Sequence, residues 1–239
     1  MPFFKRLVIL LLAGAWLAWA TPASAGPPFL TDDPEPTDYH KWEIYNFVGG
    51  ASEPGFSAID TGLDLNYGAF HDVQLSATFP LHRETGAPLD TGDVEVAAKF
   101  KLLHQYEDTA SIDFTVFPRV ILPTGRGSSH AQILLPAWAQ RDFGKWQVFG
   151  GGGYTINPGV GNRDYWIEGL AVTRQVRPGF QLGVEEFSQG PATDGDRPLT
   201  VLNLGALVHI AGPFSVIGSF GKGVNRPQTV FYTALKLDL

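Results

Sequence analysis

The sequence predicts an all-β protein, an antiparallel up-and-down transmembrane β-barrel of about 12 strands. Three observations predict this class: a signal peptide, a dozen segments of alternating apolar and polar residues, and connections that alternate between short and long. The clearest alternating segment covers residues 59–67. Alternation gives each strand one apolar and one polar face, which suits a closed sheet with lipid outside it.

The first 25 residues have the three parts of a secretory signal peptide. Lys5 and Arg6 precede an apolar run, and the small residues 23–25 precede the expected cleavage site before Gly26. The apolar run has about 14 residues, fewer than the roughly 20 that a membrane-spanning helix needs. We therefore expect a cleavable signal rather than a membrane anchor.

Composition limits the partners of the exported chain. Removing residues 1–25 leaves 15 basic and 24 acidic residues, and this negative charge disfavours nucleic acid as a partner. Cysteine is absent, so neither disulfides nor thiolate chemistry is expected. The remaining length suits one all-β domain. We expect the acidic, proline-rich residues 26–38 to precede a barrel over residues 39–239.

Twelve strands are expected, and most are long enough to cross the hydrocarbon layer when tilted. They lie near residues 40–48, 57–67, 73–81, 92–103, 110–122, 131–140, 146–156, 164–175, 180–188, 199–210, 214–222 and 229–239. The connections near 68–72, 104–109, 141–145, 176–179 and 211–213 are short, and those near 49–56, 82–91, 123–130, 157–163, 189–198 and 223–228 are longer. Short periplasmic turns and longer external loops alternate in this way in outer-membrane barrels, and an even strand count puts both termini on the periplasmic side.

The alternation also assigns a facing to each strand. Rows such as Val73–Leu81 and Leu202–Ile210 place apolar residues on one face and polar or charged residues of both signs on the other. A soluble barrel would turn the apolar face inward, whereas export, long strands and charges of both signs favour the opposite orientation. Aromatic residues near strand ends, such as Trp146, Tyr165 and Trp166, are typical of interfacial girdles, although β-propensity alone also explains them. The expected lumen-facing charges are Asp60, Asp64, Glu95, Lys99, Lys101, Asp113, Arg119, Arg174 and Glu185.

The segment 26–38 carries four carboxylates, Asp32, Asp33, Glu35 and Asp38. It could enter the barrel as a lumen plug that pairs with inward Lys or Arg, or remain a solvated periplasmic tail. Calcium binding is the weakest of the three interpretations, and the six histidines lack metal-ligand spacing. No metal and no cofactor are expected.

Two loops could carry chemistry at the external mouth. Asn157, Arg163 and Asp164 are candidates for a constriction, although a stable turn is the simpler interpretation. Ser128, Ser129 and His130 share another loop, but nothing around them resembles an enzyme motif. Glycines 150–153 indicate a bulge or close backbone approach within a strand. Because no enzyme motif surrounds the serine-histidine loop, we do not expect an enzyme.

Several motifs resemble one outer-membrane family. They are Gly26–Pro36 leading into Trp42–Tyr45, Tyr154–Trp166, Leu122–Gly125 and Gly150–Tyr154. The family is the one named for the MetA pathway of phenol degradation, and the resemblance spans nearly the whole exported chain. It implies an outer-membrane β-barrel with a passive transport role, without established substrate or binding residues. The final strand also resembles the signature that the outer-membrane assembly machinery recognises, with Leu239 where Phe or Trp is usual.

The resulting expectation is a passive channel or transporter in the outer membrane for a small-molecule solute, aromatic or apolar if the family name is a guide. Its other expected partners are outer-membrane lipid and the assembly machinery. The alternatives are a closed structural or adhesive barrel acting through its external loops, and a barrel enzyme that modifies lipid or lipopolysaccharide.

Overall fold

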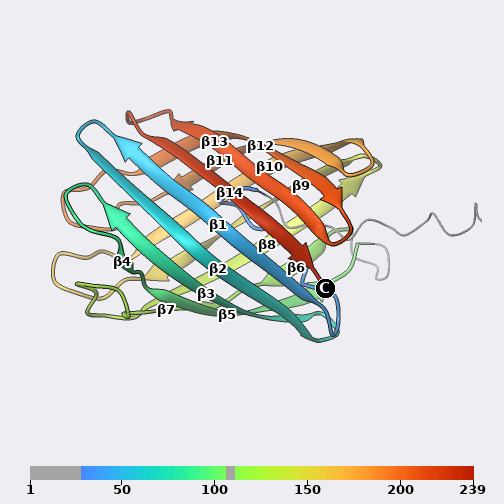
Figure 1. Cartoon of the computed structure of the whole chain (residues 1–239), viewed down its shortest axis with the longest axis horizontal. Coiled ribbons are helices and arrows are strands. Elements are labelled where there is room, and N and C mark those ends of the chain that lie inside the picture. The colour runs from blue at the N-terminus through green and yellow to red at the C-terminus, as the bar shows by residue number, and fades with distance from the viewer. Residues whose placement is uncertain (1–27, 106–110) are drawn as a thin grey trace, which may run out of the picture.

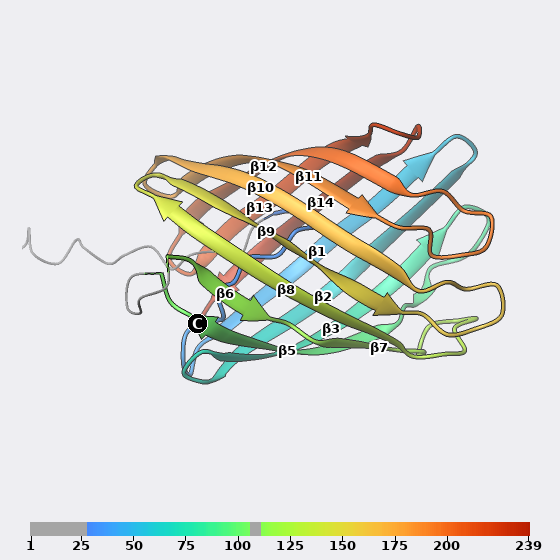
Figure 2. The same cartoon turned by 180° about the vertical axis from the view of Figure 1, so that it is seen from behind.

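The computed structural model describes residues 28–105 and 111–239, so the expected signal peptide lies outside the described residues. The described chain forms one closed antiparallel β-barrel (Figures 1 and 2). Its strands are β1 (Trp42–Glu53), β2 (Phe56–Phe70), β3 (Val73–Glu84), β4 (Asp90–Thr91), β5 (Val94–Leu103), β6 (Asp113–Val116), β7 (Arg119–Leu122), β8 (Gln132–Phe143), β9 (Trp146–Ile156), β10 (Tyr165–Arg177), β11 (Phe180–Gln189), β12 (Leu199–Ala211), β13 (Phe214–Gly223) and β14 (Thr229–Asp238).

The barrel closes where the first and last long strands meet. β1 pairs with β14 from Glu43 opposite Asp238 to Ser52 opposite Thr229. Beyond this ladder, the backbone N–H of Trp42 donates to the carbonyl of Leu239 at 3.0 Å, and that of Leu239 donates back at 2.9 Å. On the other side, β3 pairs with β5, while β6 and β7 together join β5 to β8. No long strand in the described barrel is therefore left with a free edge.

The predicted twelve-stranded barrel is confirmed. β6 and β7 occupy one barrel position, separated by Phe117 and Pro118, and they keep the same register against β8. The ladder is interrupted because proline has no N–H to donate. β4 is a two-residue strand that pairs with β3 within a loop.

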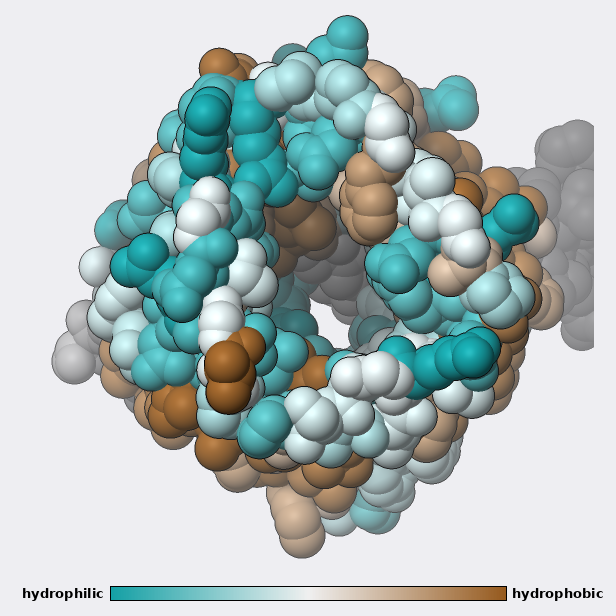
Figure 3. Space-filling view, turned by 90° about the vertical axis from the view of Figure 1, so that its left-hand side faces the viewer, coloured by the Kyte–Doolittle hydropathy of each residue, from teal (hydrophilic) through white to brown (hydrophobic). Residues whose placement is uncertain are grey.

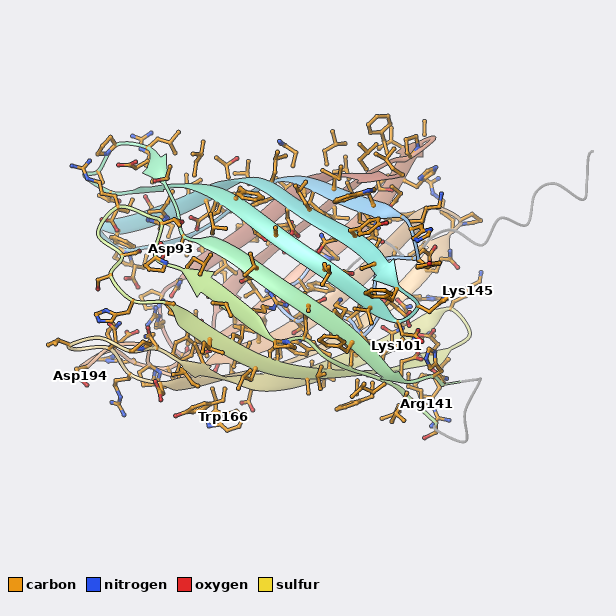
Figure 4. All side chains as sticks on the ribbon, turned by 90° about the horizontal axis from the view of Figure 1, so that it is seen from below. Asp93, Lys101, Arg141, Lys145, Trp166 and Asp194 are labelled. Carbon is orange, nitrogen blue, oxygen red and sulfur yellow. The ribbon has the colours of Figure 1, made fainter. Side chains whose placement is uncertain are left out.

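The connections sort to two ends of the barrel. The turn end holds Trp42, Leu239 and the tight turns at 71–72, 144–145, 178–179 and 212–213. The loop end holds the connections 54–55, 85–93, 123–131, 157–164, 190–198 and 224–228. Figure 4 shows Arg141 and Lys145 at the turn end, and Asp93 and Asp194 at the loop end.

One predicted loop was wrong. Residues 49–56 are mostly strand, and the connection is the two-residue turn of Pro54 and Gly55, where Gly55 has a φ of 84°. Gly49 and Gly50 look like turn residues in the sequence, but they pair within β1. A Cβ on Gly50 would meet the carbonyl oxygen of Ala58, so this glycine marks a close approach of two backbones.

The apolar rows face outward, as predicted. Leu75, Leu202 and Leu204 are 48%, 54% and 64% exposed, and Trp166 points away from the barrel (Figure 4). Figure 3 shows hydrophobic residues on the outer wall and hydrophilic residues around the opening at the loop end. Such a wall is what a barrel needs to contact lipid.

The interior is less uniformly polar than the alternation predicts. Buried polar side chains share it with two apolar clusters, one around Phe47 and Ile217 and one around Trp138 and Phe187. Tyr165, expected in an interfacial girdle, packs against the second cluster instead. Among the described residues, no helix combines the length and the apolar character required to span a bilayer.

The outward orientation predicts the effect of a charge on the outer wall. Leu204→Arg, near the middle of β12, should lower the free energy of unfolding by about 2–4 kcal/mol, because arginine is poorly solvated by lipid. Denaturant unfolding in lipid vesicles measures the change. Val224→Arg, in the β13–β14 loop, is the control and should have a much smaller effect; equal losses would contradict the outward orientation of this row.

Candidate functional site

The candidate functional site is the lumen, where residues 28–37 run inside the barrel wall (Figures 1 and 2). We call residues 28–37 the inner segment. Its Thr31, Asp33 and Thr37 are at most 6% exposed. It has no regular secondary structure, so its backbone groups find partners among side chains of the wall.

Lysine and arginine side chains of the wall hold the acidic part of the inner segment. The Lys99 ammonium lies 3.0 Å from an Asp32 carboxylate oxygen and donates to the carbonyls of Asp33 and Glu35 at 3.0 and 3.2 Å. The Arg119 guanidinium contacts the other Asp32 oxygen at 2.6 Å. Because Lys99 is only 3% exposed, its charge requires such partners.

Two further side chains of the wall, Lys101 and Thr115, extend this arrangement toward the turn end. The Lys101 ammonium bridges Glu35 at 2.7 Å and Asp113 at 3.1 Å. The buried hydroxyl of Thr115 donates to the Pro34 carbonyl at 2.6 Å. The charges of β5 are therefore partnered partly by the wall and partly by the inner segment.

Glu185 holds the start of the inner segment from the opposite side of the wall. Its carboxylate accepts the backbone N–H groups of Leu30 and Thr31 at 3.3 and 2.5 Å, and the side-chain amide of Asn203 at 2.5 Å. Glu185 is 2% exposed. Near the turn end, Gln74 accepts the backbone N–H of Thr37 at 2.7 Å, which fixes the other end of the segment.

Glycines of the wall make room for the segment. A Cβ at Gly205 would lie 2.5 Å from the Phe29 ring, and one at Gly183 would lie 3.0 Å from it. A Cβ at Gly169 would overlap the Thr31 hydroxyl. These three positions form a slot on β10, β11 and β12 that side chains of ordinary size would fill.

A cavity of about 210 Å³ remains beside the inner segment. Its lining includes Lys99 and Arg119 together with five carboxylates, Asp32, Asp33, Glu35, Glu43 and Asp64. The rest of the lining is Phe29, Leu30, Thr31, Tyr45, Asn66, Gln74, Ile217 and Tyr232. Figure 3 shows that the barrel is hollowed at the loop end, so the interior is open toward that side.

Most predicted lumen charges lie on the inner face, in two kinds of environment. Lys99, Lys101, Arg119 and Glu185 contact the inner segment directly. The others pair with neighbours in the wall: Asp60 with His82 at 2.7 Å, Asp64 with Thr78 at 3.1 Å, Glu95 with Arg119 at 3.4 Å, and Asp113 with Lys101 at 3.1 Å.

Two sequence assignments were wrong. Arg174 lies on the outer face, where its guanidinium is 5.1 Å from the centre of the Trp146 ring, while its neighbour Thr173 is buried inside. Asp38, unlike Asp32, Asp33 and Glu35, is exposed where the chain leaves the lumen. Its backbone carbonyl accepts the N–H of Lys41 at 2.9 Å, so it belongs to a turn.

The external mouth candidates form a hydrogen-bonded loop. Asp164 accepts the backbone N–H of Asn157 at 2.8 Å and the Tyr154 hydroxyl at 3.0 Å. Asn157 is 6% exposed and donates to the carbonyls of Arg163 and Ala192. No Arg163–Asp164 ion pair occurs within the described part of the chain. This arrangement favours the stable turn over a constriction.

The serine-histidine loop holds a contact between neighbours. The Ser129 hydroxyl is 2.7 Å from His130 Nδ1, and both residues are exposed. The nearby carboxylate of Asp93 accepts hydrogen bonds from Ser128 and from the Gly125 backbone. In residues 28–105 and 111–239 no cluster of three potential metal ligands occurs.

Sequence reasoning missed several interior residues. The fully buried Lys236 ammonium lies between Glu43 at 3.2 Å and Asp238 at 2.9 Å. Alternation along the last strand could have placed Lys236 inside, because its neighbours Leu235 and Leu237 belong to the apolar row. Nothing local marks the glycine slot or the contacts of Gln74 and Asn203, since these depend on the path of the inner segment.

Two adjacent carboxyls of the inner segment differ in acidity. Burial raises the pKa of Asp33 to about 7, with Lys99 opposing the shift and Asp32 and Glu35 adding to it. Burial also acts on Asp32, but Lys99 and Arg119 outweigh it and hold the pKa of Asp32 below its ordinary value. Near neutral pH, Asp32 is therefore the charged partner of the lumen cations.

Solved structures that share this architecture include an outer membrane channel, a porin and the translocator domain of an autotransporter. The COG4313 outer membrane channel from Pseudomonas putida F1 superposes with a TM-score of 0.59 at 16% identity, covering 85% of this chain and 98% of that one. The KdgM porin in complex with disordered oligogalacturonate gives 0.58 at 10% identity, covering 82% and 98%. The translocator domain of the autotransporter NalP from Neisseria meningitidis gives 0.51 at 11% identity, covering 84% and 88%.

These similarities show the barrel fold. No family model matches the chain, and no curated protein sequence matches it. The resemblance to the family of the MetA phenol-degradation pathway therefore stays a prediction.

The glycine slot predicts how the inner segment can be displaced. Gly205→Val should expel Phe29, because a side chain would occupy the space of its ring. A cysteine introduced at buried Thr31 reports this displacement, because the chain has no cysteine of its own. In the Gly205→Val background it should react with a maleimide about tenfold faster, which corresponds to a loss of about 1.4 kcal/mol in the free energy of docking. Gly218→Ala, on the outward side of β13, is the control; equal labelling in both backgrounds would contradict the slot.

Asp33 predicts a pH dependence. Its pKa is about 7 when the segment is docked and near the ordinary 3.8 in water, so docking should weaken as pH rises from about 4 to about 7 and change little at higher pH. Ion conductance in planar bilayers should increase over this range. In Asp33→Asn the step should be absent, with conductance at its low-pH value, whereas Asp60→Asn should retain it. A step that persists in Asp33→Asn would assign the titration to another group.

Proposed function

We propose that this protein is a passive channel of the outer membrane that conducts small solutes, and that its inner segment narrows the lumen. The observation that carries the proposal is the cavity beside the segment, enclosed by a barrel that is hollowed at the loop end. A barrel acting only through its loops would not need a lumen of this kind.

The outer wall and the fold support the location. Exposed leucine, valine and phenylalanine side chains cover the barrel, as a lipid-facing surface requires. The resembling structures include one described as an outer membrane channel and one described as a porin. Outer-membrane lipid and the assembly machinery are then the expected partners, reached after export by the signal peptide.

The path through the lumen would pass between the inner segment and the wall formed by β1, β2, β13 and β14. Tyr45, Ile217 and Tyr232 offer apolar contacts on this side, whereas Glu43 and Asp64 offer charge. Apolar contacts of this kind support small aromatic or apolar solutes, the class suggested by the family resemblance. Transport would be diffusion, since no energy-coupling motif is found in the sequence.

Replacing the inner segment tests the proposal. If residues 28–37 are exchanged for a glycine-serine stretch of equal length, single-channel conductance should rise several-fold. Selectivity should also shift from cations toward anions, because Asp32, Asp33 and Glu35 are lost while Lys99, Lys101 and Arg119 remain. Reversal potentials in a salt gradient measure the shift.

The unaltered protein and Asp194→Asn, a change in an exposed loop, serve as controls and should behave alike. Unchanged conductance after the exchange would show that the segment does not narrow the path. Absence of current from both proteins, correctly assembled, would instead favour the closed structural barrel.

A further inference from the structure

Two cations in the lumen meet at one aromatic ring. The Arg119 guanidinium lies 4.1 Å from the centre of the Phe117 ring, and the Lys99 ammonium lies 4.9 Å from it. Phe117 is 4% exposed and belongs to the inner apolar cluster with Trp138. Packing against the ring orients both cations, which face the cavity on one side.

The anion that these cations bind comes from the protein itself. Asp32 places one oxygen on each of them, at 3.0 Å from Lys99 and 2.6 Å from Arg119. Arg119 still has capacity, because its buried Nε has no hydrogen-bond partner within the described residues and its contact with Glu95 is long, at 3.4 Å. The wall thus forms a carboxylate site occupied by an irregular segment.

The cavity next to this site is suited to an organic body. Phe29, Leu30, Tyr45, Ile217 and Tyr232 line it. A cavity of about 150 Å³ holds benzene, so the 210 Å³ found here is sufficient for an aromatic ring that carries a carboxylate.

We propose that the lumen binds small organic monocarboxylates, with the carboxylate replacing that of Asp32 on Arg119 and Lys99 and the body lying in the cavity. This inference deepens the proposed channel function by naming the solute class. Asp32 then acts as an internal competitor that fills the site when no solute is present.

The surrounding charges favour a single negative charge. Glu43, Asp64 and Glu35 also border the cavity, and they would repel a dianion such as phosphate. Glu43 is paired with Lys236 and Asp64 with Thr78, so these groups do not need the two cations as partners. Removing the carboxylate of Asp32 leaves one vacant position beside Arg119 and Lys99, whose other carboxylate contacts are longer, at 3.4 Å to Glu95 and 3.6 Å to Asp33.

Equilibrium dialysis of the full-length, detergent-solubilised protein with radiolabelled benzoate tests the inference without relying on conduction. The native chain should bind benzoate more tightly than benzamide, which has the ring without the charge, and than acetate, which lacks the ring. Asp32→Asn should lower the dissociation constant for benzoate by about tenfold, since the competitor is removed. Arg119→Gln should abolish the preference for benzoate over benzamide.

Asp60→Asn is the matched control, because it removes the same charge from the lumen at a position paired with His82. Its benzoate affinity should stay within about twofold of the native value. If Asp32→Asn does not assemble, the native chain and Arg119→Gln decide the question by their benzoate–benzamide preference. Equal binding of benzoate and benzamide to the native chain and Asp32→Asn would overturn the inference.

Conductance separates the two proposals. Ion current without selective benzoate binding would refute the proposed carboxylate site but not the proposed channel. Selective binding in a protein that never conducts would retain the site and refute the channel.

Discussion

Backbone pairing between β1 and β14 is the constraint on which the rest of the structure depends. In a bilayer an open sheet edge would leave N–H and C=O groups without partners, so a spanning sheet has to close. Here the closing ladder runs the length of β1 and ends in the reciprocal bonds of Trp42 and Leu239. Closure creates an interior sealed from lipid, and every polar group described in the lumen depends on that separation.

The interior then has its own requirement, because buried cations need counter-charges. Lys236 satisfies this within the wall through Glu43 and Asp238. Lys99 instead takes Asp32 and two backbone carbonyls from the inner segment. Within the described residues, the positive charge of Lys99 in the wall is thus compensated only by a partner in the lumen. A segment held by ion pairs, by Glu185 and by the glycine slot can meet this need while leaving a cavity beside it.

Ionic contacts and shape complementarity restrain different parts of the inner segment. Phe29 lies against glycines, whereas Asp32 and Glu35 lie against lysine and arginine. A solute that replaces a single carboxylate would therefore not need to expel the whole segment. In the channel proposed above, this separation would allow a solute to be accepted through a local exchange of partners, with the barrel wall unchanged.

The sequence by itself determined the barrel, its twelve positions and the outward facing of the apolar rows, because a period of two residues is a local property. It also identified Lys99, Lys101, Arg119 and Glu185 as interior charges. The tertiary structure decided what those charges contact, since their partners in the inner segment lie 64 to 155 residues away along the chain. Arg174 lies outside beside Trp146 because its position in the alternation, and not its charge, sets its facing, so this assignment could have been made from the sequence. The glycine slot cannot be recognised in the sequence, because the segment that it accommodates reaches it only when the barrel has closed.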